Sequence, residues 1–333
     1  MGFKTFSLFS DIRYYLKLRQ ELLNHLSKHP DDWSKFQQMF ILTVDKVYDD
    51  ILSIEKENIA EFEADVYRGK RIFEKRYRNY FIGGEYIKRS LEKPCGYAGD
   101  FKIIDDIYRN EPHTTGFERL WDNYFQQLAT PKAIRERKED FKKIIIDFII
   151  KKNNKNIRIM NLASGPAREI KEIFESGTNN ISLNVIFDCY DIDTKAIEYA
   201  QQLLNNGKNV NFFQKNAIRL ALKKNIEEEI PYKYDLIYST GLFDYLDERV
   251  ATRLVSNLKK LLKQDGLMVI SNARDKYSNS SAGWMEWVAE WYLIYRTEDE
   301  FKKIFIDAGI SPNNLKIISQ KSKIMQYCFA RSK

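Results

Sequence analysis

The sequence has few of the residues that hold disulfide-linked or metal-bound proteins together. Its 333 residues contain three cysteines, Cys95, Cys189 and Cys328, and three histidines. The cysteines are odd in number and widely spaced, which predicts reduced thiols rather than a disulfide framework. His25 and His29 stand four residues apart without a third ligand near them in the sequence, so we expect no metal site.

Long apolar runs are missing as well. No stretch approaches the roughly 18 apolar residues that a membrane-spanning helix needs. The first residues, MGFKTFSLFSDIRYYLKLRQ, have neither the apolar block nor the small-residue cleavage site of a signal peptide. Phe6 stands where a myristoylation signal has Ser or Thr. The sequence therefore predicts a cytoplasmic protein without a membrane partner.

Basic residues are in excess, but they do not form a block. The formal net charge is +7, and Lys and Arg are interspersed with Asp and Glu along the whole chain. The sequence contains neither a basic cluster nor an aromatic-studded recognition motif. These features disfavour a nucleic-acid partner, although the net charge leaves it open as a less favoured alternative.

The hydrophobic pattern changes near residue 150. Before this point, apolar residues recur at intervals of three and four, which is typical of amphipathic helices. One such stripe comprises Phe36, Phe40, Val44, Val47, Ile51 and Ile54. The segment KPCGYAGD (93–100) interrupts the helices because its Pro and Gly residues exclude a regular element. We predict an N-terminal helical domain over 1–150 that covers a pocket or forms a homodimer contact.

After KKNNKN (151–156), apolar strand candidates alternate with helix-length segments. The strand candidates are IRIMNLA, LNVIFDCYDI, NVNFFQ, YDLIYST and GLMVISNA, and the helix candidates are REIKEIFES, TKAIEYAQQLLNN and RVATRLVSNLKKLLKQ. This alternation predicts a doubly wound α/β fold with a mostly parallel sheet. The last apolar segments, LKIISQ and IMQYCFARS, predict an antiparallel closing hairpin. The second predicted domain is therefore 151–333.

The loop after the first predicted strand, NLASGPA (161–167), is the candidate ligand loop, because doubly wound sheets bind ligands at the carboxyl ends of their strands. Only Gly165 remains where a dinucleotide fingerprint has three glycines, which disfavours a cofactor with a pyrophosphate. S-adenosylmethionine has no phosphate and is favoured instead. Asp191, near the end of the second strand, can accept hydrogen bonds from both hydroxyls of its ribose.

Other residues at the same sheet edge complete the predicted cofactor site. Asn216 follows the third strand and can contact the edge of adenine. Arg135 in PKAIRERKE is predicted to bind the methionine end of the cofactor, with Arg168 as the alternative. The predicted cofactor-binding residues are Arg135, Asn161, Ala163, Ser164, Gly165, Asp191, Ile192, Asn216, Ala217, Ser239 and Gly241.

These segments resemble class I S-adenosylmethionine-dependent methyltransferases over roughly residues 90–330. NLASGPA takes the place of the family's glycine-rich motif, with Asn161 instead of the usual acid and with Ala163 and Ala167 instead of glycines. KPCGYAGDFKIIDDIY, PKAIRERKE, YDLIYSTGLFDYL and MEWVAEWYLIYRTEDEF together are similar to one bacterial subgroup with an N-terminal helical region. Some members of that subgroup are assigned to the synthesis of 3-hydroxy fatty acid methyl esters. The resemblance implies a Rossmann-like fold, S-adenosylmethionine as cofactor, and methyl transfer.

Three segments are candidates for the acceptor side. The predicted catalytic residues are Tyr97 and Asp100 in the GYAGD loop, Tyr245 after the fourth strand, and Glu286 in a helix expected to begin around Trp284. On that helix, Glu286 and Glu290 would share one face with aromatic side chains, as in a cation-binding cage. The predicted substrate-binding residues are Asp244, Trp287, Glu290, Trp291, Tyr295 and Arg296. Structural alternatives are that Asp100 caps the following helix, that Tyr245 packs under the sheet edge, and that the Trp and Glu residues pack the two domains together.

The sequence thus predicts a small-molecule methyltransferase of class EC 2.1.1.-. The subgroup resemblance favours O-methylation of a hydroxy-acyl carboxylate, whereas the Glu, Trp and Tyr cluster favours N-methylation of an amino or guanidino group. A carboxylate acceptor needs no general base, but a protonated amine must first lose a proton. Two further alternatives are an RNA or protein methyltransferase and a non-catalytic S-adenosylmethionine-binding module, the latter suggested by the missing glycines.

Overall fold

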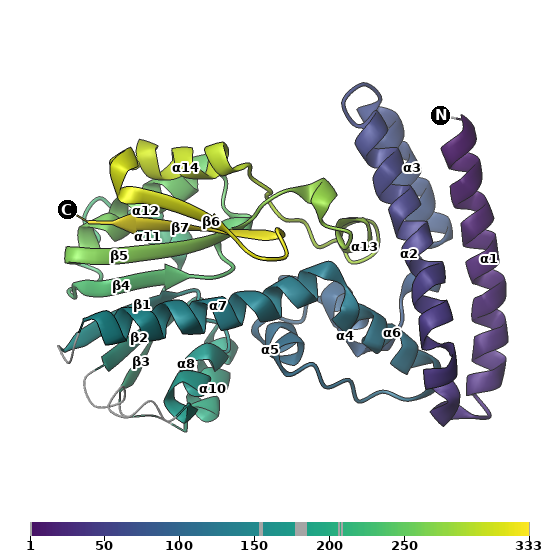
Figure 1. The fold of residues 1–333 in the computed structure, drawn as a ribbon, viewed down its shortest axis with the longest axis horizontal. Coiled ribbons are helices and arrows are strands. Elements are labelled where there is room, and N and C mark those ends of the chain that lie inside the picture. The colour runs from purple at the N-terminus through teal and green to yellow at the C-terminus, as the bar shows by residue number, and fades with distance from the viewer. Residues whose placement is uncertain (1, 153–155, 177–184, 206, 208, 333) are drawn as a thin grey trace. The chain divides into compact units, whose positions relative to one another are not determined.

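The computed structural model describes all residues except 1, 153–155, 177–184, 206, 208 and 333. The chain divides into two compact units (Figure 1). The first consists of Met1–Lys132 and Lys276–Tyr292, and the second of Ala133–Asp275 and Leu293–Lys333. Neither range coincides with the predicted 1–150 and 151–333.

The difference in boundaries has a physical cause in helix α7 (Ala129–Lys151). Most of this helix packs on the sheet of the second unit, where the Phe141 ring lies 5.8 Å from that of Tyr238 and 5.3 Å from that of Tyr327. The change of composition at KKNNKN therefore marks the end of α7 and not the boundary between the units. Asn153, Asn154 and Lys155 of that segment lie outside the described residues.

The first unit is helical, as predicted for the N-terminal part of the chain. Its described elements are α1 (Gly2–Leu26), η1 (Pro30–Asp32), α2 (Trp33–Asn58), α3 (Glu63–Arg76), η2 (Arg78–Phe81), α4 (Gly84–Glu92), α5 (Phe101–Arg109), α6 (Gly116–Gln127), η4 (Lys276–Ser278) and α13 (Ala282–Trp287). The predicted stripe on α2 is confirmed by the burial of Phe40, Val44, Val47 and Ile51, while Phe36 and Ile54 are half-buried.

Aromatic side chains form the core of the first unit. The Trp121 ring lies 4.9 Å from the Phe40 ring in an edge-on contact, and Tyr15 stacks on Phe81 at 4.5 Å. All four side chains are buried. Edge-to-face and offset contacts of this kind add to the free energy gained by burying the rings, so the high aromatic content of the chain is used here for packing.

Within the described residues, the second unit contains a seven-stranded sheet with the order β3-β2-β1-β4-β5-β7-β6. Its strands are β1 (Ile157–Leu162), β2 (Val185–Asp191), β3 (Val210–Gln214), β4 (Tyr234–Ser239), β5 (Leu262–Ala273), β6 (Leu315–Ser319) and β7 (Met325–Arg331). Strands β1 to β5 are parallel, and β7 is antiparallel to both β5 and β6. This arrangement confirms the predicted doubly wound sheet and its closing hairpin.

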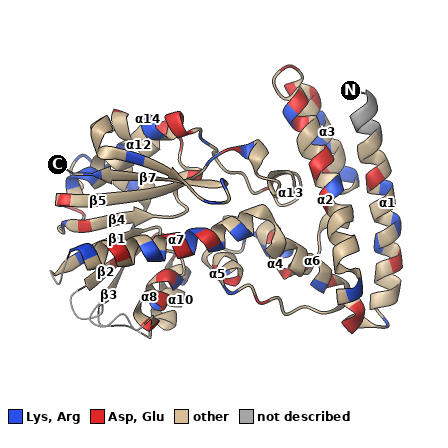
Figure 2. Cartoon of the chain, in the orientation of Figure 1, with Lys and Arg blue, Asp and Glu red and all other residues tan. Residues whose placement is uncertain are grey.

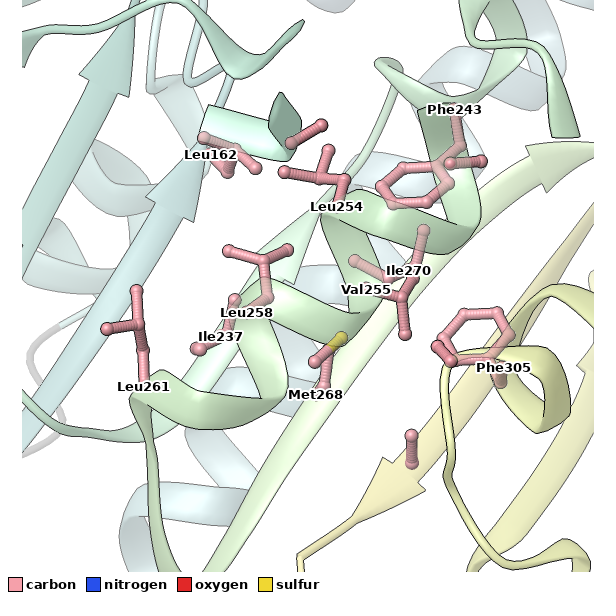
Figure 3. Close-up of a cluster of buried hydrophobic side chains, with 14 of the residues drawn as sticks. Leu162, Ile237, Phe243, Leu254, Val255, Leu258, Leu261, Met268, Ile270 and Phe305 are labelled. Carbon is pink, nitrogen blue, oxygen red and sulfur yellow. The ribbon is translucent and has the colours of Figure 1, made fainter. Parts of the chain in front are cut away.

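Helices cover both faces of this sheet, as expected for parallel strands. The described helices of the second unit, besides α7, are α8 (Arg168–Glu175), α10 (Thr194–Leu203), α11 (Ala217–Leu222), α12 (Glu248–Leu261) and α14 (Glu298–Asp307), with the short turns η3 (Phe243–Tyr245) and η5 (Pro312–Asn314). Figure 3 shows Leu254, Val255 and Leu258 of α12 packed with side chains of β4, β5 and α14 in one buried cluster. On the sheet's other face, α8 places Phe174 5.7 Å from Phe187.

Most predicted segments begin and end within a few residues of the observed ones. The predicted strand LNVIFDCYDI is observed over Val185–Asp191, and its first residues, Leu183 and Asn184, lie outside the described part of the chain. Asn206, the last residue of the predicted helix TKAIEYAQQLLNN, is also outside it. Of the helices that are described, none is both long and apolar enough to cross a membrane.

One buried carboxylate joins four strands of the sheet. Asp188 on β2 accepts hydrogen bonds from Arg158 Nε on β1 (2.6 Å), Asn211 Nδ2 on β3 (2.8 Å) and the Tyr234 hydroxyl on β4 (2.9 Å). The Arg158 guanidinium also lies over the Tyr232 ring at 3.5 Å. Asp188 is fully buried, and among the described residues this network compensates its charge.

We expect Asp188→Ala to lower the free energy of unfolding by about 3–5 kcal/mol, because the Arg158 charge and the Tyr234 hydroxyl would lose their buried partner. Urea unfolding of the full chain measures the effect. The control is Asp307→Ala, which removes an exposed carboxylate paired with Lys303 and should cost less than about 1 kcal/mol. Equal losses in the two variants would contradict the assigned role of Asp188.

Candidate functional site

The loop after β1 keeps the backbone of a glycine-rich loop although it has a single glycine. Ala163, Gly165 and Ala167 have φ angles of 56°, 52° and 51°. Glycine adopts this left-handed region freely, whereas alanine does so at a cost of about 1–2 kcal/mol. Apart from Gly165 and its two chain neighbours, no described atom lies within 4 Å of the position that a Cβ on Gly165 would occupy. The space beside Gly165 is therefore available to a ligand.

Asp191 connects this loop to the end of β2. Its Oδ2 accepts the Gly165 amide at 2.8 Å, and its Oδ1 accepts the Asp193 amide at 3.0 Å. Burial raises the pKa of Asp191, while the backbone hydrogen bonds oppose the shift. Each carboxylate oxygen has two lone pairs, and each of these two hydrogen bonds uses one of them.

A second carboxylate lies behind the loop, in the first turn of α8. Glu169 Oε1 accepts Asn161 Nδ2 at 2.9 Å and the Tyr238 hydroxyl at 2.8 Å, and all three side chains are buried. Burial is the largest influence on the Glu169 carboxyl and raises its pKa. Position 161 therefore needs a donor: an acid there would face Glu169 with a like charge.

Two serines lie at the ends of the neighbouring strands β1 and β4. The Ser239 hydroxyl donates to the Leu162 carbonyl at 2.8 Å, which ties the strand ends together. The Ser164 amide donates to the Tyr190 carbonyl at 3.1 Å, but the buried Ser164 Oγ has no hydrogen-bond partner among the described residues. A buried hydroxyl without a partner is unfavourable, and a polar ligand in the crevice would satisfy it.

The remaining predicted cofactor residues line the ends of β2 and β3. Ile192 follows Asp191 directly and is 55% exposed. Asn216 caps α11, its Oδ1 accepting the Arg219 amide at 3.1 Å, and Ala217 begins that helix, half-buried. The cap uses the carbonyl oxygen of Asn216 and leaves its amide nitrogen for the predicted contact with adenine.

Helix α7 carries the predicted Arg135 and, two residues later, a second arginine, Arg137. Arg135 is half-buried, and burial lowers its pKa. Arg137 is 4% exposed and lies beside the loop after β4, its Nη2 3.6 Å from the position of a Cβ on Gly241. Arg137 is not among the predicted cofactor residues. It lies on the apolar stripe of α7, formed by Ala133, Arg137, Phe141, Ile145 and Ile149, all buried.

The GLFDYL segment is built around two buried charges. Asp244 Oδ1 accepts Asn272 Nδ2 at 2.7 Å and the Ala273 amide at 2.6 Å. Arg296 Nη1 donates to the Phe243 carbonyl at 2.8 Å and to Asn272 Oδ1 at 2.7 Å, and its Nη2 donates to the Leu246 carbonyl. Burial raises the pKa of Asp244. These contacts hold η3 against the end of β5. They favour structural roles for Asp244 and Arg296, which were predicted to bind substrate. Tyr245, in contrast, is 44% exposed.

In the first unit, Asp100 caps the helix that follows it, which is the structural alternative to its predicted catalytic role. Its Oδ1 accepts the amides of Lys102 and Ile103 at 3.0 and 2.9 Å, which caps α5. The same oxygen accepts Arg89 Nε at 3.0 Å, and the carboxylate is 1% exposed. Tyr97, earlier in the same loop, is half-buried.

The predicted long helix after Trp284 is wrong. Helix α13 ends at Trp287, and Glu290 is in the left-handed region with φ of 49°. The amides of Ala289 and Trp291 turn back to the carbonyls of Trp284 and Met285, at 3.2 and 2.7 Å. The chain therefore leaves the helix through a turn that contains the left-handed Glu290.

As a consequence, the predicted cage residues do not share a helix face. Glu286 Oε2 pairs with Lys276 Nζ at 2.7 Å, and burial raises the Glu286 pKa. Lys276 also pairs with Glu55, which accepts Trp287 Nε1 at 2.8 Å. Glu290 pairs with Arg78 and, at 3.8 Å, with Lys93. Trp291 belongs to the first unit, whereas Tyr295, half-buried, belongs to the second. In the described part of the chain, no group of three or more His, Cys, Asp or Glu residues is placed to hold a metal.

Comparisons with known proteins agree with this fold. Residues 161–268 match the family model described as a methyltransferase domain. The structure is similar to that of a protein described as a possible exported protein from Bordetella parapertussis, with 16% identity and a TM-score of 0.55, covering 99% of this chain and 96% of that one. No curated protein matches the sequence significantly.

Similarity to two methyltransferase structures is weaker. Magnesium protoporphyrin IX methyltransferase from Synechocystis PCC 6803 with bound SAH has 14% identity and a TM-score of 0.49, with 75% of this chain and 100% of that chain covered. N-methyltransferase NodS from Bradyrhizobium japonicum WM9 in complex with SAH has 12% identity and a TM-score of 0.40, with 59% and 87% covered. The matched segment 161–268 begins at Asn161 and includes Gly165 and Asp191.

We expect Asn161→Asp to lower the free energy of unfolding by about 3 kcal/mol at pH 8, because two buried carboxylates would face each other. The loss should shrink at pH 5, where the pair can share a proton. Adding Glu169→Gln to the same chain restores one donor and one acceptor and should recover most of the stability. Urea unfolding of the two single variants and the double variant measures this coupling, and strictly additive effects would contradict it.

Proposed function

We propose that this protein is an S-adenosylmethionine-dependent methyltransferase (EC 2.1.1.-) that acts on a small molecule. The observation that carries the proposal lies at the ends of β1 and β2, where a Cβ on Gly165 would meet open space and the Asp191 carboxylate accepts the amides of Gly165 and Asp193. The match of residues 161–268 to a methyltransferase domain supports it, and such a domain implies S-adenosylmethionine as the methyl donor.

The residues of the crevice suit a nucleoside without phosphates. Asp191 would accept the ribose hydroxyls, and the backbone at Gly165 would lie against the ligand. The buried Ser164 Oγ, which has no partner in the described chain, would gain one. A pyrophosphate would instead need several glycine-backed amides, and this loop has alanines at 163 and 167. When bound, the cofactor supplies a methyl group that is already activated on a sulfonium.

The acceptor is proposed to be a carboxylate or an amine, bound next to the loop after β4. Tyr245 in this loop is the exposed member of the predicted catalytic set, whereas the carboxylates of Asp100 and Glu286 are paired with Arg89 and Lys276. An O-methylation of a carboxylate needs only positioning and exclusion of water, because the nucleophile is already charged. Of the two reaction types, this set of residues favours O-methylation.

The charge distribution gives a macromolecular acceptor no further support. Lys and Arg are interspersed with Asp and Glu on the helices of both units (Figure 2). A cytoplasmic location and a role of the helical unit as a pocket cover or homodimer contact stay predictions from the sequence.

We expect Asp191→Asn to weaken binding of S-adenosylhomocysteine about 10- to 100-fold, because hydrogen bonds to a carboxylate are worth about 1.5–3 kcal/mol each. Titration calorimetry measures the Kd. The matched control is Asp235→Asn. Asp235 lies near the start of β4, at the sheet edge opposite the candidate site, and accepts the Arg158 amide at 2.9 Å and Lys263 Nζ at 2.6 Å. This substitution should lower stability without changing the Kd.

The 2′-deoxy analogue of S-adenosylhomocysteine separates ribose binding from loop support. It should bind the wild type more weakly than the parent compound, and it should bind Asp191→Asn about as well as the parent does. If the missing hydroxyl weakened binding equally in both proteins, Asp191 would not bind the ribose.

Activity is tested by S-adenosylhomocysteine release across hydroxy fatty acids, amino acids and guanidines. We expect turnover with a carboxylate acceptor, and in Asp191→Asn a higher KM for S-adenosylmethionine, because this variant binds the cofactor more weakly. Turnover confined to RNA or protein would favour the macromolecular alternative. Tight cofactor binding without turnover on any of these acceptors would favour a non-catalytic binding module.

A further inference from the structure

Arg137 is a buried charge that the cofactor and packing roles described above do not use. It is 4% exposed on a helix stripe that is otherwise apolar. Transferring a guanidinium from water into such a place is unfavourable unless its donors are hydrogen-bonded and its charge is paired. The contacts of Arg137 therefore show whether the protein itself supplies the partner.

The protein supplies a nearby charge for Arg137 but no hydrogen-bond acceptor among the described residues. The nearest carboxylate oxygen is Asp244 Oδ2, 3.7 Å from Arg137 Nη1, which is beyond hydrogen-bond distance. The other oxygen of Asp244 is occupied by Asn272 and the Ala273 amide. Arg137 Nε is buried without a partner, and its guanidinium makes no hydrogen bond to any described residue.

The other arginines in the interior of the second unit behave differently. Arg158 contacts both oxygens of Asp188, at 2.6 and 3.2 Å. Arg296 donates to two carbonyl oxygens and to Asn272. Asp244 is also close enough to Arg296 for the two charges to interact. Arg296 also interacts with the charges of Glu248, Glu300 and Asp247. For Arg137 the ion pair in the described structure is the one with Asp244, and at 3.7 Å it compensates the charge only in part.

The position of Arg137 relates this charge to the crevice. Its Nη2 faces Gly241, two residues past the end of β4, and a Cβ there would be 3.6 Å away. Strand β4 is the neighbour of β1, which carries the Gly165 loop. The change in strand order between β1 and β4 is where doubly wound sheets bind their ligands.

We propose that Arg137 is the carboxylate-binding residue of this crevice, donating from its guanidinium to a carboxylate that a ligand brings. The inference rests on the proposed function. A guanidinium matches a carboxylate with two parallel hydrogen bonds, which would satisfy the unused donors and the partly compensated charge together. The carboxylate comes from the amino-acid end of the cofactor or from the acceptor, and the experiment distinguishes the two sources.

The test uses Arg137→Met and Arg137→Lys in the full chain, with Arg253→Met as the control. Arg253 is exposed on α12, outside the site. Two nucleosides are titrated by calorimetry: S-adenosylhomocysteine, which has a carboxylate, and 5′-methylthioadenosine, which has the same nucleoside without one. Hexanoate and hexanamide are then titrated into the S-adenosylhomocysteine complex as charged and uncharged acceptor mimics.

If the cofactor brings the carboxylate, Arg137→Met weakens S-adenosylhomocysteine about 10- to 100-fold and leaves 5′-methylthioadenosine unchanged. If the acceptor brings it, both nucleosides bind normally and hexanoate binding is lost, while hexanamide is unaffected. Arg137→Lys keeps the charge without the paired donors and should be intermediate. Arg253→Met should match the wild type in every titration.

Two results would overturn the inference. One is unchanged binding of every probe in Arg137→Met. The other is an equal loss of both nucleosides in Arg137→Met and in Arg137→Lys, which would show that Arg137 only supports the fold. If the wild type bound neither nucleoside, the proposed function itself would fail, and this result is distinct from a failure seen only in the variants.

Discussion

The hydrogen bonds of the Asp191 carboxylate are the interaction on which the candidate site depends. They join the Gly165 amide, in the loop after β1, to the Asp193 amide, in the turn after β2. The two segments lie side by side because β1 and β2 are parallel neighbours with Asn161 opposite Cys189. Without a carboxylate between them, two backbone donors would lose their acceptors at the place where a ligand must meet the backbone.

The loop after β1 has three residues in the left-handed conformation although it contains a single glycine. Ala163 and Ala167 keep the left-handed conformation, and Ala167 is fully buried, so its methyl group is packed rather than exposed to the ligand. Gly165 stays a glycine at the position that borders open space. Asn161 fits its surroundings for a similar reason, because the neighbouring Glu169 is a carboxylate that accepts its amide nitrogen.

The longer motifs of the sequence are used largely for architecture. In KPCGYAGD, the aspartate caps a helix and pairs with Arg89. In GLFDYL, Asp244 and the more distant Arg296 hold η3 to the end of β5. Such segments have many chemically suggestive residues, but their polar atoms are consumed by the backbone groups that irregular segments expose. The aspartates of these two motifs are therefore already hydrogen-bonded, whereas Arg137, Asp191 and Ser164 keep unused donors or acceptors.

The sequence by itself determined the fold class, the strands and most helices, because hydrophobic periodicity is a local property that burial enforces on each element. It also located the loop at Gly165 and the acid at Asp191, since the carboxyl ends of parallel strands must meet at one edge. Only the tertiary structure decided which arginine of α7 is buried, where α13 ends, and which carboxylates are paired. These outcomes depend on partners in other segments of the chain, such as Gly241 for Arg137 and Lys276 for Glu286. A local sequence pattern does not predict such contacts.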